Sequence, residues 1–276
     1  MVFGAWTDKS CKTTLALTFP KPLAYLEFDV GGFDRAKYRF KEDVASGNII
    51  TSYKDGKGKE HLLRYVMPYQ YDAIDATKLT VRPSKRITGI KELWYRFLVN
   101  YMQLLEDDGI ATVVVDTATL LWEICATAYL QEKQELQLDV KGNVLPNEKL
   151  RVNLLPIEYR EPNIRMRGII YQAKAHGKHL VLTHHAKDEY AMMPVKGEMV
   201  EARTGRKERS GWGQLGDGAD VIVHTYIKME KQDKNKRVPY CKVELAEVQE
   251  LVDMEFKEPT YEQLASVIAM IKGEWK

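Results

Sequence analysis

The hydrophobic positions of the chain alternate between short apolar runs and longer segments with helical spacing. Segment 88–106 places apolar residues at helical intervals, with Thr88 as the expected cap. Further helices are expected at about 119–135 and 162–175. Between these segments lie short apolar runs of the kind found in buried strands, at 23–28, 112–115, 179–183 and 219–226. Strands alternating with helices predict an α/β fold with a mainly parallel sheet flanked by helices.

The C-terminal region has a different pattern, since 238–248 predicts one arm of a β-hairpin and 260–271 a closing helix. Three stretches interrupt the alternation. We expect a hairpin or an insertion at 51–87, a loop at 137–161, and a mobile basic loop at 187–218, which is rich in glycine and arginine. A chain of 276 residues therefore fits a single domain, 1–276, with these excursions.

Composition and charge narrow the classes of function. With 29% charged residues and a net charge of +2, the chain is not a strongly cationic protein that coats DNA, so any nucleic-acid contact must be regional. Cys11, Cys125 and Cys241 are far apart and odd in number, which suggests neither a disulfide framework nor a zinc ribbon. We expect a cytoplasmic protein without membrane association, because no run is long enough to span a bilayer and no signal peptide is recognisable.

The candidate chemistry starts in the stretch GAWTDKSCKTTLA near the N-terminus. Phosphate-binding loops surround phosphates with backbone N–H groups at a helix N-terminus, while a lysine neutralises the charge. A threonine hydroxyl next to that lysine binds Mg²⁺. Lys12 and Thr13 stand in this order at the start of a predicted helix, followed by Thr14.

The glycines of this stretch depart from the phosphate-loop pattern. GxxxxGK[ST] requires glycine at positions 6 and 11, where the chain has Trp6 and Cys11; the nearby glycine is Gly4. A cysteine at position 11 costs backbone freedom if its φ must be positive. On these residues alone, a nucleotide site and an ordinary capped helix are equally good interpretations. Val2 and Phe3 are all that remains of the preceding strand, so either this strand is very short or the native chain starts upstream.

Carboxylates follow at the expected distances. Asp116 follows the apolar run of VVVDT, at the place where a phosphate-loop enzyme has the carboxylate that completes the magnesium shell. The alternative is an aspartate at the end of a strand that caps the next helix. Asp29 in YLEFDVGG is a candidate to orient the attacking water, with Glu27 two residues before it. Three such elements in order favour the nucleotide site.

The segments GAWTDKSCKTTLALTFPKPLAYLEFDVGG, ATVVVDTATLL, KHLVLTHHAKDE and GADVIVHTY, in this order, resemble the phage-encoded RecA-like P-loop ATPases of the AAA type, which include the Sak-type single-strand annealing and recombination family. The resemblance covers roughly 1–50 and 86–248. It implies a RecA-like fold, ATP and Mg²⁺ as cofactors, and ATP hydrolysis. It also implies homo-oligomeric rings or filaments on single-stranded DNA, phage recombination or replication proteins as partners, and the host cytoplasm as the location.

The resemblance also implies roles for individual residues. Asp29 falls where RecA-like proteins carry a longer catalytic glutamate, and of the adjacent His184 and His185 we expect His184 to sense the γ-phosphate, the alternative being a satisfied loop histidine. The implied catalytic residues are Asp29, Asp116 and His184, and the implied Mg²⁺ ligands are Thr13 and Asp116. The implied nucleotide-binding residues are Gly4, Ser10, Cys11, Lys12, Thr13 and Thr14.

Two basic clusters leave their interpretation open. The residues Arg203, Arg206, Lys207 and Arg209 are candidates for an arginine finger acting on a neighbouring subunit or for phosphate contacts to single-stranded DNA, on which Trp212 would stack a base. The alternative is a solvated loop. The same ambiguity holds for Lys149, Arg151, Arg160, Arg165 and Arg167.

Three functions remain open from the sequence. The leading hypothesis is the DNA-dependent ATPase. The second is a scaffold protein whose phosphate loop has lost hydrolysis, and the third is a small-molecule phosphotransferase, for which we find no clear lid or substrate cleft.

Overall fold

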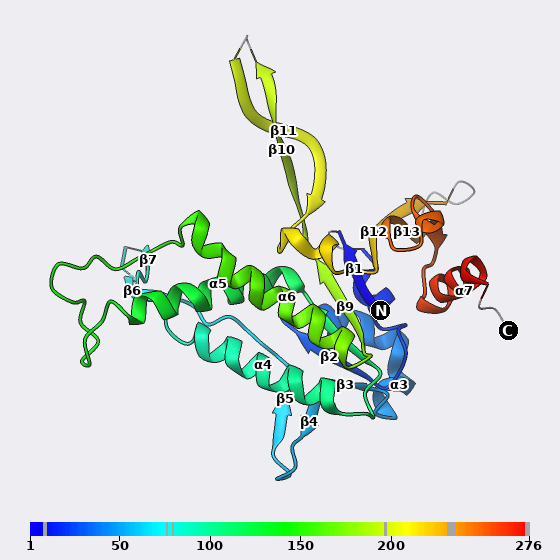
Figure 1. Cartoon of the computed structure of the whole chain (residues 1–276), viewed down its shortest axis with the longest axis horizontal. Helices are drawn as coiled ribbons and strands as arrows, with labels where there is room; N and C mark the ends of the chain where they lie inside the picture. Colours follow the sequence, from blue (N-terminus) through cyan, green and yellow to red (C-terminus); the bar gives the residue numbers. More distant parts are fainter. Residues whose placement is uncertain (8–9, 76, 79, 196–197, 231–235, 274–276) are drawn as a thin grey trace.

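A mainly parallel eight-stranded sheet forms the centre of the protein (Figure 1). The computed structural model describes residues 1–7, 10–75, 77–78, 80–195, 198–230 and 236–273. The strand order is β14-β13-β12-β1-β9-β8-β2-β3. The six parallel strands are β1 (Val2–Trp6), β2 (Leu23–Glu27), β3 (Ile49–Ile50), β8 (Thr112–Asp116), β9 (His179–His184) and β12 (Val221–Met229). β1 has five residues, so it is a full strand rather than the remnant that Val2 and Phe3 suggested.

Both faces of the sheet are covered, which explains the uninterrupted apolar residues in the middle of β8 (Val113–Val115) and β9 (Leu180–Leu182). Val113 and Val115 of β8 pack toward one core, and Val114 packs toward the other. The first core is completed by α4 (Ile90–Glu106), α5 (Ala118–Glu135) and α6 (Arg160–Ala175). The second core is completed by α1 (Lys12–Ala16), α2 (Gly32–Ala36) and α7 (Tyr261–Lys272).

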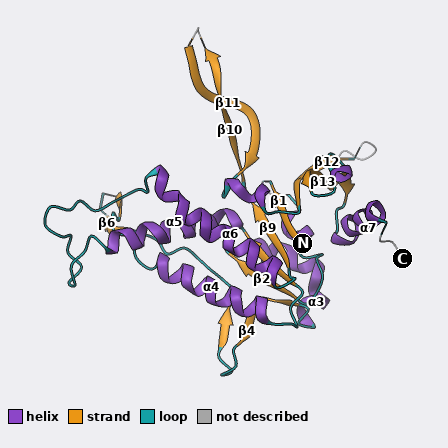
Figure 2. Ribbon diagram, viewed as in Figure 1, coloured by secondary structure: helices purple, strands orange, loops and turns teal. Residues whose placement is uncertain are grey.

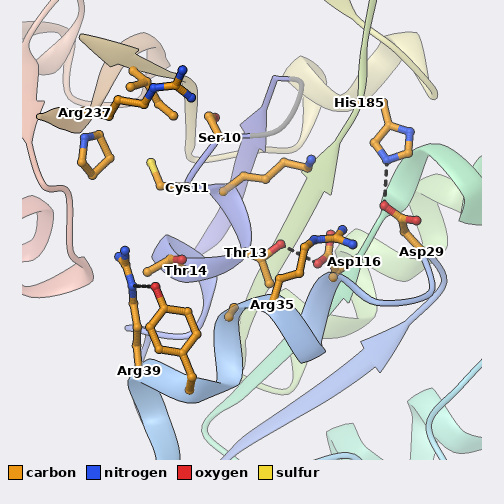
Figure 3. A pocket seen from close by; sticks show the side chains of 16 residues that line it. Ser10, Cys11, Thr13, Thr14, Asp29, Arg35, Arg39, Asp116, His185 and Arg237 are labelled. Carbon is orange, nitrogen blue, oxygen red and sulfur yellow. Dashed lines mark hydrogen bonds and ion pairs between the residues drawn. The ribbon is translucent and has the colours of Figure 1, made fainter. Parts of the chain in front are cut away.

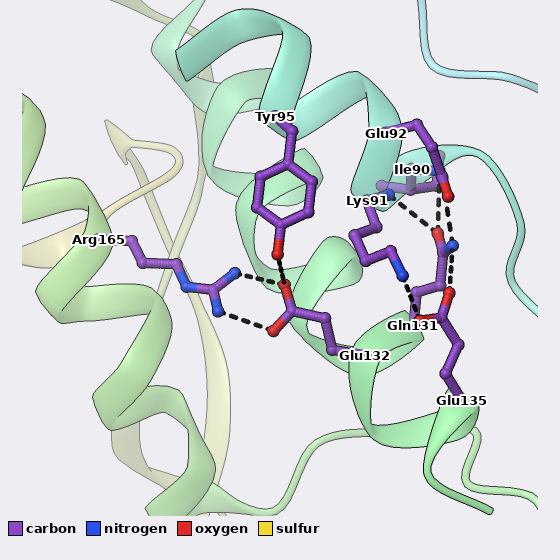
Figure 4. Close-up of polar contacts among 8 residues, drawn as sticks. All are labelled: Ile90, Lys91, Glu92, Tyr95, Gln131, Glu132, Glu135 and Arg165. Atoms are coloured by element: carbon purple, nitrogen blue, oxygen red, sulfur yellow. Dashed lines mark hydrogen bonds and ion pairs between the residues drawn. The ribbon is translucent and has the colours of Figure 1, made fainter. Parts of the chain in front are cut away.

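The start of α4 differs from the prediction. Its N-cap is Gly89 in the left-handed region (φ 79°), not Thr88. Glycine has no side chain that could accept a hydrogen bond from the first turn of the helix. Gln131 of α5 takes over this function, because its Oε1 accepts from the backbone N of Ile90 (3.0 Å) and of Lys91 (2.9 Å) (Figure 4). A partner 40 residues away in the sequence thus replaces the local cap.

The C-terminal region forms the expected hairpin and helix. β13 (Arg237–Ala246) pairs antiparallel with β12, β14 (Glu255–Lys257) pairs antiparallel with β13, and α7 follows. The Thr260 side chain caps α7 by accepting from Gln263 N. The predicted fold class, an α/β protein with a mainly parallel sheet flanked by helices and a C-terminal β-hairpin and helix, is confirmed.

The excursions contain more regular structure than their sequences suggested. Two small hairpins lie within 51–87, namely β4 (Ser52–Lys54) with β5 (Glu60–Leu62) and β6 (Tyr71–Asp75) with β7 (Thr80–Pro83). Stretch 137–161 is largely irregular up to η2 (Pro156–Tyr159). Short helical turns complete the chain: η1 (Lys37–Phe40), α3 (Lys41–Ala45), η3 (Gly213–Asp217) and η4 (Gln249–Leu251).

Most of the stretch 187–218, expected as a mobile basic loop, belongs to a long β-hairpin. β10 (Ala186–Val195) pairs antiparallel with β11 (Glu198–Arg209), and the hairpin projects from the body of the protein (Figure 2). The sequence of the hairpin is as polar as that of a loop, which is why it was predicted as one. In the structure its charged side chains form ion pairs across the two strands, as Lys187 does with Glu208 (3.0 Å). The part of the chain that the structure describes contains no helix long and apolar enough to cross a membrane.

Candidate functional site

A pocket of about 1000 Å³ lies at the carboxyl ends of the central strands, which is the edge where open α/β sheets bind ligands. Residues 10–14 form one wall (Figure 3). Asp29 and the short helix after it form a second wall, while Asp116 and His185 come from β8 and the residue after β9. The β12–β13 hairpin contributes Ile227, Arg237 and Pro239.

Trp6 and Cys11, which stand where the pattern has its glycines, are not among the described residues with positive φ. Trp6, which stands where the pattern has its first glycine, is the last residue of β1 and stacks on His224 with ring centroids 4.1 Å apart. Cys11 has φ −67° and ψ 16°, which any residue adopts easily, so a glycine is not required there. The substitution that made the pattern doubtful therefore carries no backbone strain.

Lys12 opens α1, and its side chain folds back over the loop. Its Nζ donates to the carbonyl O of Thr7 (3.3 Å), and the residue is 8% exposed. Ser10 is held by a 2.7 Å hydrogen bond between its Oγ and Oγ1 of Thr225 on β12, while Cys11 and Thr14 also line the pocket. Burial raises the pKa of the Cys11 thiol to about 11, so it stays protonated at neutral pH.

Gly4 lies away from the pocket, in the interior of β1. A Cβ atom added there would lie 3.0 Å from Cδ2 of Leu215, so this glycine allows η3 to pack closely against the sheet. The sequence placed Gly4 among the nucleotide-binding residues because glycine is typical of phosphate loops; in the structure its role is packing.

The buried carboxylate of Asp116 connects the phosphate-loop helix to β8. Thr13 Oγ1 donates to Asp116 Oδ2 at 2.7 Å, and the hydroxyls of Tyr25 and Thr183 also donate to this carboxylate. Burial, together with the neighbouring Asp116 charge, raises the pKa of Tyr25 far above its ordinary value of 10, so its hydroxyl remains a donor. Gly32, the first residue of α2, completes the arrangement, since a Cβ there would lie 2.9 Å from Asp116 Oδ2.

These oxygen atoms fit the chemistry of a magnesium nucleotide. Mg²⁺ prefers oxygen ligands and is usually held by one or two carboxylates together with substrate phosphates. Thr13 keeps an oxygen lone pair for a metal while it donates its proton to Asp116. Within the described residues no group of three or more His, Cys, Asp or Glu side chains is placed to hold a metal ion, so phosphate oxygens and water would supply the remaining ligands.

The structure brings His185, not His184, to the pocket. His185 Nε2 lies 3.3 Å from Asp29 Oδ2, and both side chains line the pocket. His184 is 1% exposed, its Nδ1 is 3.1 Å from the carbonyl O of Ser210, and burial lowers its pKa to about 3. His184 is therefore a neutral core residue. Glu27 is not at the pocket either, because it pairs with Arg64 (2.9 Å).

Three arginines that the sequence did not point to also line the pocket: Arg35, Arg39 and Arg237. None of them forms an ion pair within the part of the chain that the structure describes, although Arg39 Nε donates to the hydroxyl of Tyr38 (2.8 Å). The sequence contained a signal for two of these arginines, since Arg35 and Arg39 are four residues apart and follow the Gly31-Gly32 turn. With Lys12, they give the pocket four basic side chains against the carboxylates of Asp29 and Asp116, which suits a polyanionic ligand.

The predicted basic cluster on β11 lies outside this pocket. Arg203 (3.3 Å) and Lys207 (2.7 Å) both pair with Asp188 on β10. Arg209 donates to the carbonyl O of Trp212 (3.0 Å), and Arg206 forms no ion pair among the described residues. Trp212, expected to stack on a base, is 2% exposed and donates its indole N–H to Asn163, so it cannot take that role in this conformation.

The second basic cluster is engaged in part. Arg165 makes a bidentate contact with Glu132 (2.9 and 2.8 Å), and Arg151 pairs with Glu158. Arg167 donates to the neutral side chain of Gln214 (3.2 Å), and Lys149, Arg160 and Arg167 form no ion pair among the described residues.

Neither a protein-family model nor a curated protein sequence matches the chain. Among solved structures, it is similar to the KaiC-like protein of the hyperthermophilic archaeon Pyrococcus horikoshii OT3, with 10% sequence identity and a TM-score of 0.43. The alignment covers 93% of this chain and 83% of that one. A likeness of this size assigns neither a family nor an activity.

Proposed function

We propose that the protein binds ATP with Mg²⁺ in the pocket at the sheet edge and hydrolyses it. The observation that carries this proposal is the hydrogen bond between Thr13 and Asp116, residues 103 positions apart, in the same pocket as Lys12. A lysine, the following threonine and a strand-terminal carboxylate are the three groups that a phosphate loop uses to hold a magnesium nucleotide.

Each group has a defined task in this proposal. Lys12 would exchange its contact with the Thr7 carbonyl for the terminal phosphates, and Thr13 with Asp116 would hold Mg²⁺. When bound, Mg²⁺ neutralises charge on the phosphates and orients them for in-line attack. Tyr25 and Thr183 fix the orientation of the Asp116 carboxylate through their hydroxyls.

Asp29 and His185, which are in contact and line the pocket, would position the attacking water. His185 orients the Asp29 carboxylate, which would accept a proton from the water as it attacks the γ-phosphorus. The bond from the γ-phosphorus to the bridging oxygen would break in the same displacement, and ADP would leave with that oxygen. Aspartate reaches one methylene less far than glutamate, so we propose slow hydrolysis. Arg35, from the helix that follows Asp29, would neutralise charge that develops on the transferred phosphoryl group.

The narrower activity that the sequence resemblance implies also belongs to the proposal. It is a RecA-like ATPase that acts on single-stranded DNA during phage recombination or replication, and the order of the sequence motifs supports it. The alternative is a nucleotide-binding scaffold without efficient hydrolysis.

The test is steady-state ATP hydrolysis by the wild-type protein, Lys12→Ala and the control Lys57→Ala, with and without single-stranded DNA. Lys57 lies in the exposed turn between β4 and β5, so its loss controls for charge alone. Turnover that Lys12→Ala abolishes and Lys57→Ala retains supports the ATPase, and stimulation by DNA supports the narrower activity. ATP binding without ATP hydrolysis supports the scaffold. The absence of both ATP binding and ATP hydrolysis refutes the proposal.

A further inference from the structure

The pocket at the sheet edge has a second end, away from the groups proposed to hold the phosphates. This end is lined by Tyr38 and Arg39 of η1, Ile227 of β12, and Arg237 and Pro239 of β13. Figure 3 shows Arg39 and Arg237 on the side of the pocket away from the Asp29–His185 pair. The volume of about 1000 Å³ is at the upper limit for a small-molecule site. With its phosphates fixed at the first end, a nucleotide would therefore extend its base into the second.

The second end of the pocket offers flat and apolar surfaces to a nucleobase. Tyr38 is 57% exposed, and Arg39 holds its ring through a hydrogen bond from Nε to the Tyr38 hydroxyl (2.8 Å). Ile227 is 45% exposed although it is aliphatic, and Pro239 lies opposite it in the β12–β13 ladder. Every base has a π-face, so surfaces of this kind hold a base without choosing among bases. Selection therefore requires a group that contacts the edge of the base.

The register of β12 with β13 places Arg237 at the border of this apolar wall. Ile227 pairs with Pro239, and Met229 pairs with Arg237. Residues two apart in a strand face the same side, so Arg237 and Pro239 share one face, about 7 Å apart along β13. A base whose face rests on Ile227 and Pro239 would therefore have its edge near the guanidinium of Arg237.

The guanidinium of Arg237 is available to a ligand. Glu230, which follows the residue paired with Arg237, is engaged by Lys236 (2.9 Å) and Lys257 (3.6 Å). Arg237 itself is exposed and forms no ion pair within the part of the chain that the structure describes. A guanidinium carries only donors, in a planar fork that fits two acceptors lying side by side. Arg237 therefore favours a ligand edge with two adjacent acceptors.

Guanine and adenine differ at the edge that this donor fork would meet. Guanine presents two adjacent acceptors, O6 and N7, which arginine binds in a bidentate manner. Adenine presents the acceptor N7 beside its N6 amino group, which is itself a donor and would face the donors of Arg237.

We infer that Arg237 contacts the O6 and N7 edge of the base, so that the pocket binds GTP more tightly than ATP. This inference rests on the phosphate site proposed above and adds the base to it. Because Arg237 is exposed, we expect a preference at the lower end of what a bidentate arginine gives, about five- to tenfold.

The test is isothermal titration calorimetry of GTP, inosine triphosphate and ATP, each with Mg²⁺, on the wild type, Arg237→Met and the control Arg206→Met. Inosine has the O6 and N7 atoms of guanine without its 2-amino group, so it isolates the edge that Arg237 would contact. Methionine keeps an unbranched side chain but has no N–H donor. Arg206 lies on β11 outside the pocket and forms no ion pair among the described residues. Thermal unfolding without nucleotide confirms that each variant is folded.

The wild type and Arg206→Met should bind GTP and inosine triphosphate about five- to tenfold more tightly than ATP, whereas Arg237→Met should bind all three equally. The inference is overturned if the wild type binds ATP at least as tightly as GTP, if Arg237→Met keeps the preference, or if inosine triphosphate binds like ATP. Each of these outcomes leaves the proposed function standing, since that function needs only the binding of ATP. Absence of binding of all three nucleotides refutes the phosphate site, and this inference with it.

Discussion

Gly32→Ala tests the geometry around the central carboxylate. The added Cβ would lie 2.9 Å from Asp116 Oδ2 and 3.3 Å from the hydroxyl of Tyr25, both of which are held in a buried network. Contacts this short force a displacement, and overpacking of this kind usually costs about 1–3 kcal/mol of unfolding free energy. At roughly 2–4 °C per kcal/mol, Tm should fall by about 2–12 °C.

Gly168→Ala is the matched control, because a Cβ at this position of α6 would have nothing within 4 Å. In a helix interior, alanine is more stable than glycine by about 0.5–1 kcal/mol, so Tm should rise slightly. Scanning calorimetry with and without Mg·ATP measures both effects. Displacement of Asp116 should also reduce the stabilisation of Gly32→Ala by Mg·ATP. An unchanged Tm together with unchanged stabilisation by nucleotide would refute the proposed role of the Gly32–Asp116 contact.

Three further predictions concern single side chains. Cys11→Gly should lower the unfolding free energy by about 0.5–1 kcal/mol. It should not tighten ATP binding, because Cys11 is already unstrained at φ −67°. Tenfold tighter binding in a calorimetric titration would contradict this prediction. Tyr25→Phe should cost about 1.5–3 kcal/mol, measured by urea unfolding, since it removes a donor to the buried Asp116 carboxylate; an unchanged midpoint would argue against that hydrogen bond. His184 is neutral when folded, with its pKa lowered to about 3, and protonates near its ordinary pKa of 6.5 when unfolded, so its contribution to stability falls as pH drops below 6.5. Between pH 7 and pH 5, the wild type should therefore lose about 2 kcal/mol more than His184→Gln, and equal losses would show that His184 is not buried and neutral.

The sequence predicted the parts of the fold that are locally encoded. Short apolar runs identified the central strands, and helical spacing identified α4, because burial on both faces or on one stripe leaves a direct pattern in the sequence. Asp116 and Thr13 were predicted from the sequence, since each ends or opens a recognisable element; the structure joins them by a hydrogen bond, and their role in binding Mg²⁺ stays a prediction. The 187–218 hairpin was missed because its charges pair across strands, which makes it as polar as a loop.

The details of the site depended on the tertiary structure. Adjacent residues at the end of β9 face opposite directions, and only the fold decides that His184 enters the core while His185 meets Asp29. Arg237 reaches the pocket from a C-terminal hairpin that lies more than 200 residues from the phosphate loop. No local sequence pattern predicts such a contact.

The binding of Mg·ATP at Thr13 and Asp116 is tested most simply by isothermal titration calorimetry of ATP, with and without Mg²⁺, for the wild type and Thr13→Val. Valine keeps the shape of threonine but removes the hydroxyl that contacts Asp116. We predict that Mg²⁺ strengthens binding to the wild type and that Thr13→Val loses about tenfold in affinity when Mg²⁺ is present, corresponding to about 1.4 kcal/mol. Without Mg²⁺, the two proteins should bind ATP equally. Equal affinity of the two proteins in the presence of Mg²⁺, or no ATP binding by the wild type, would contradict the account.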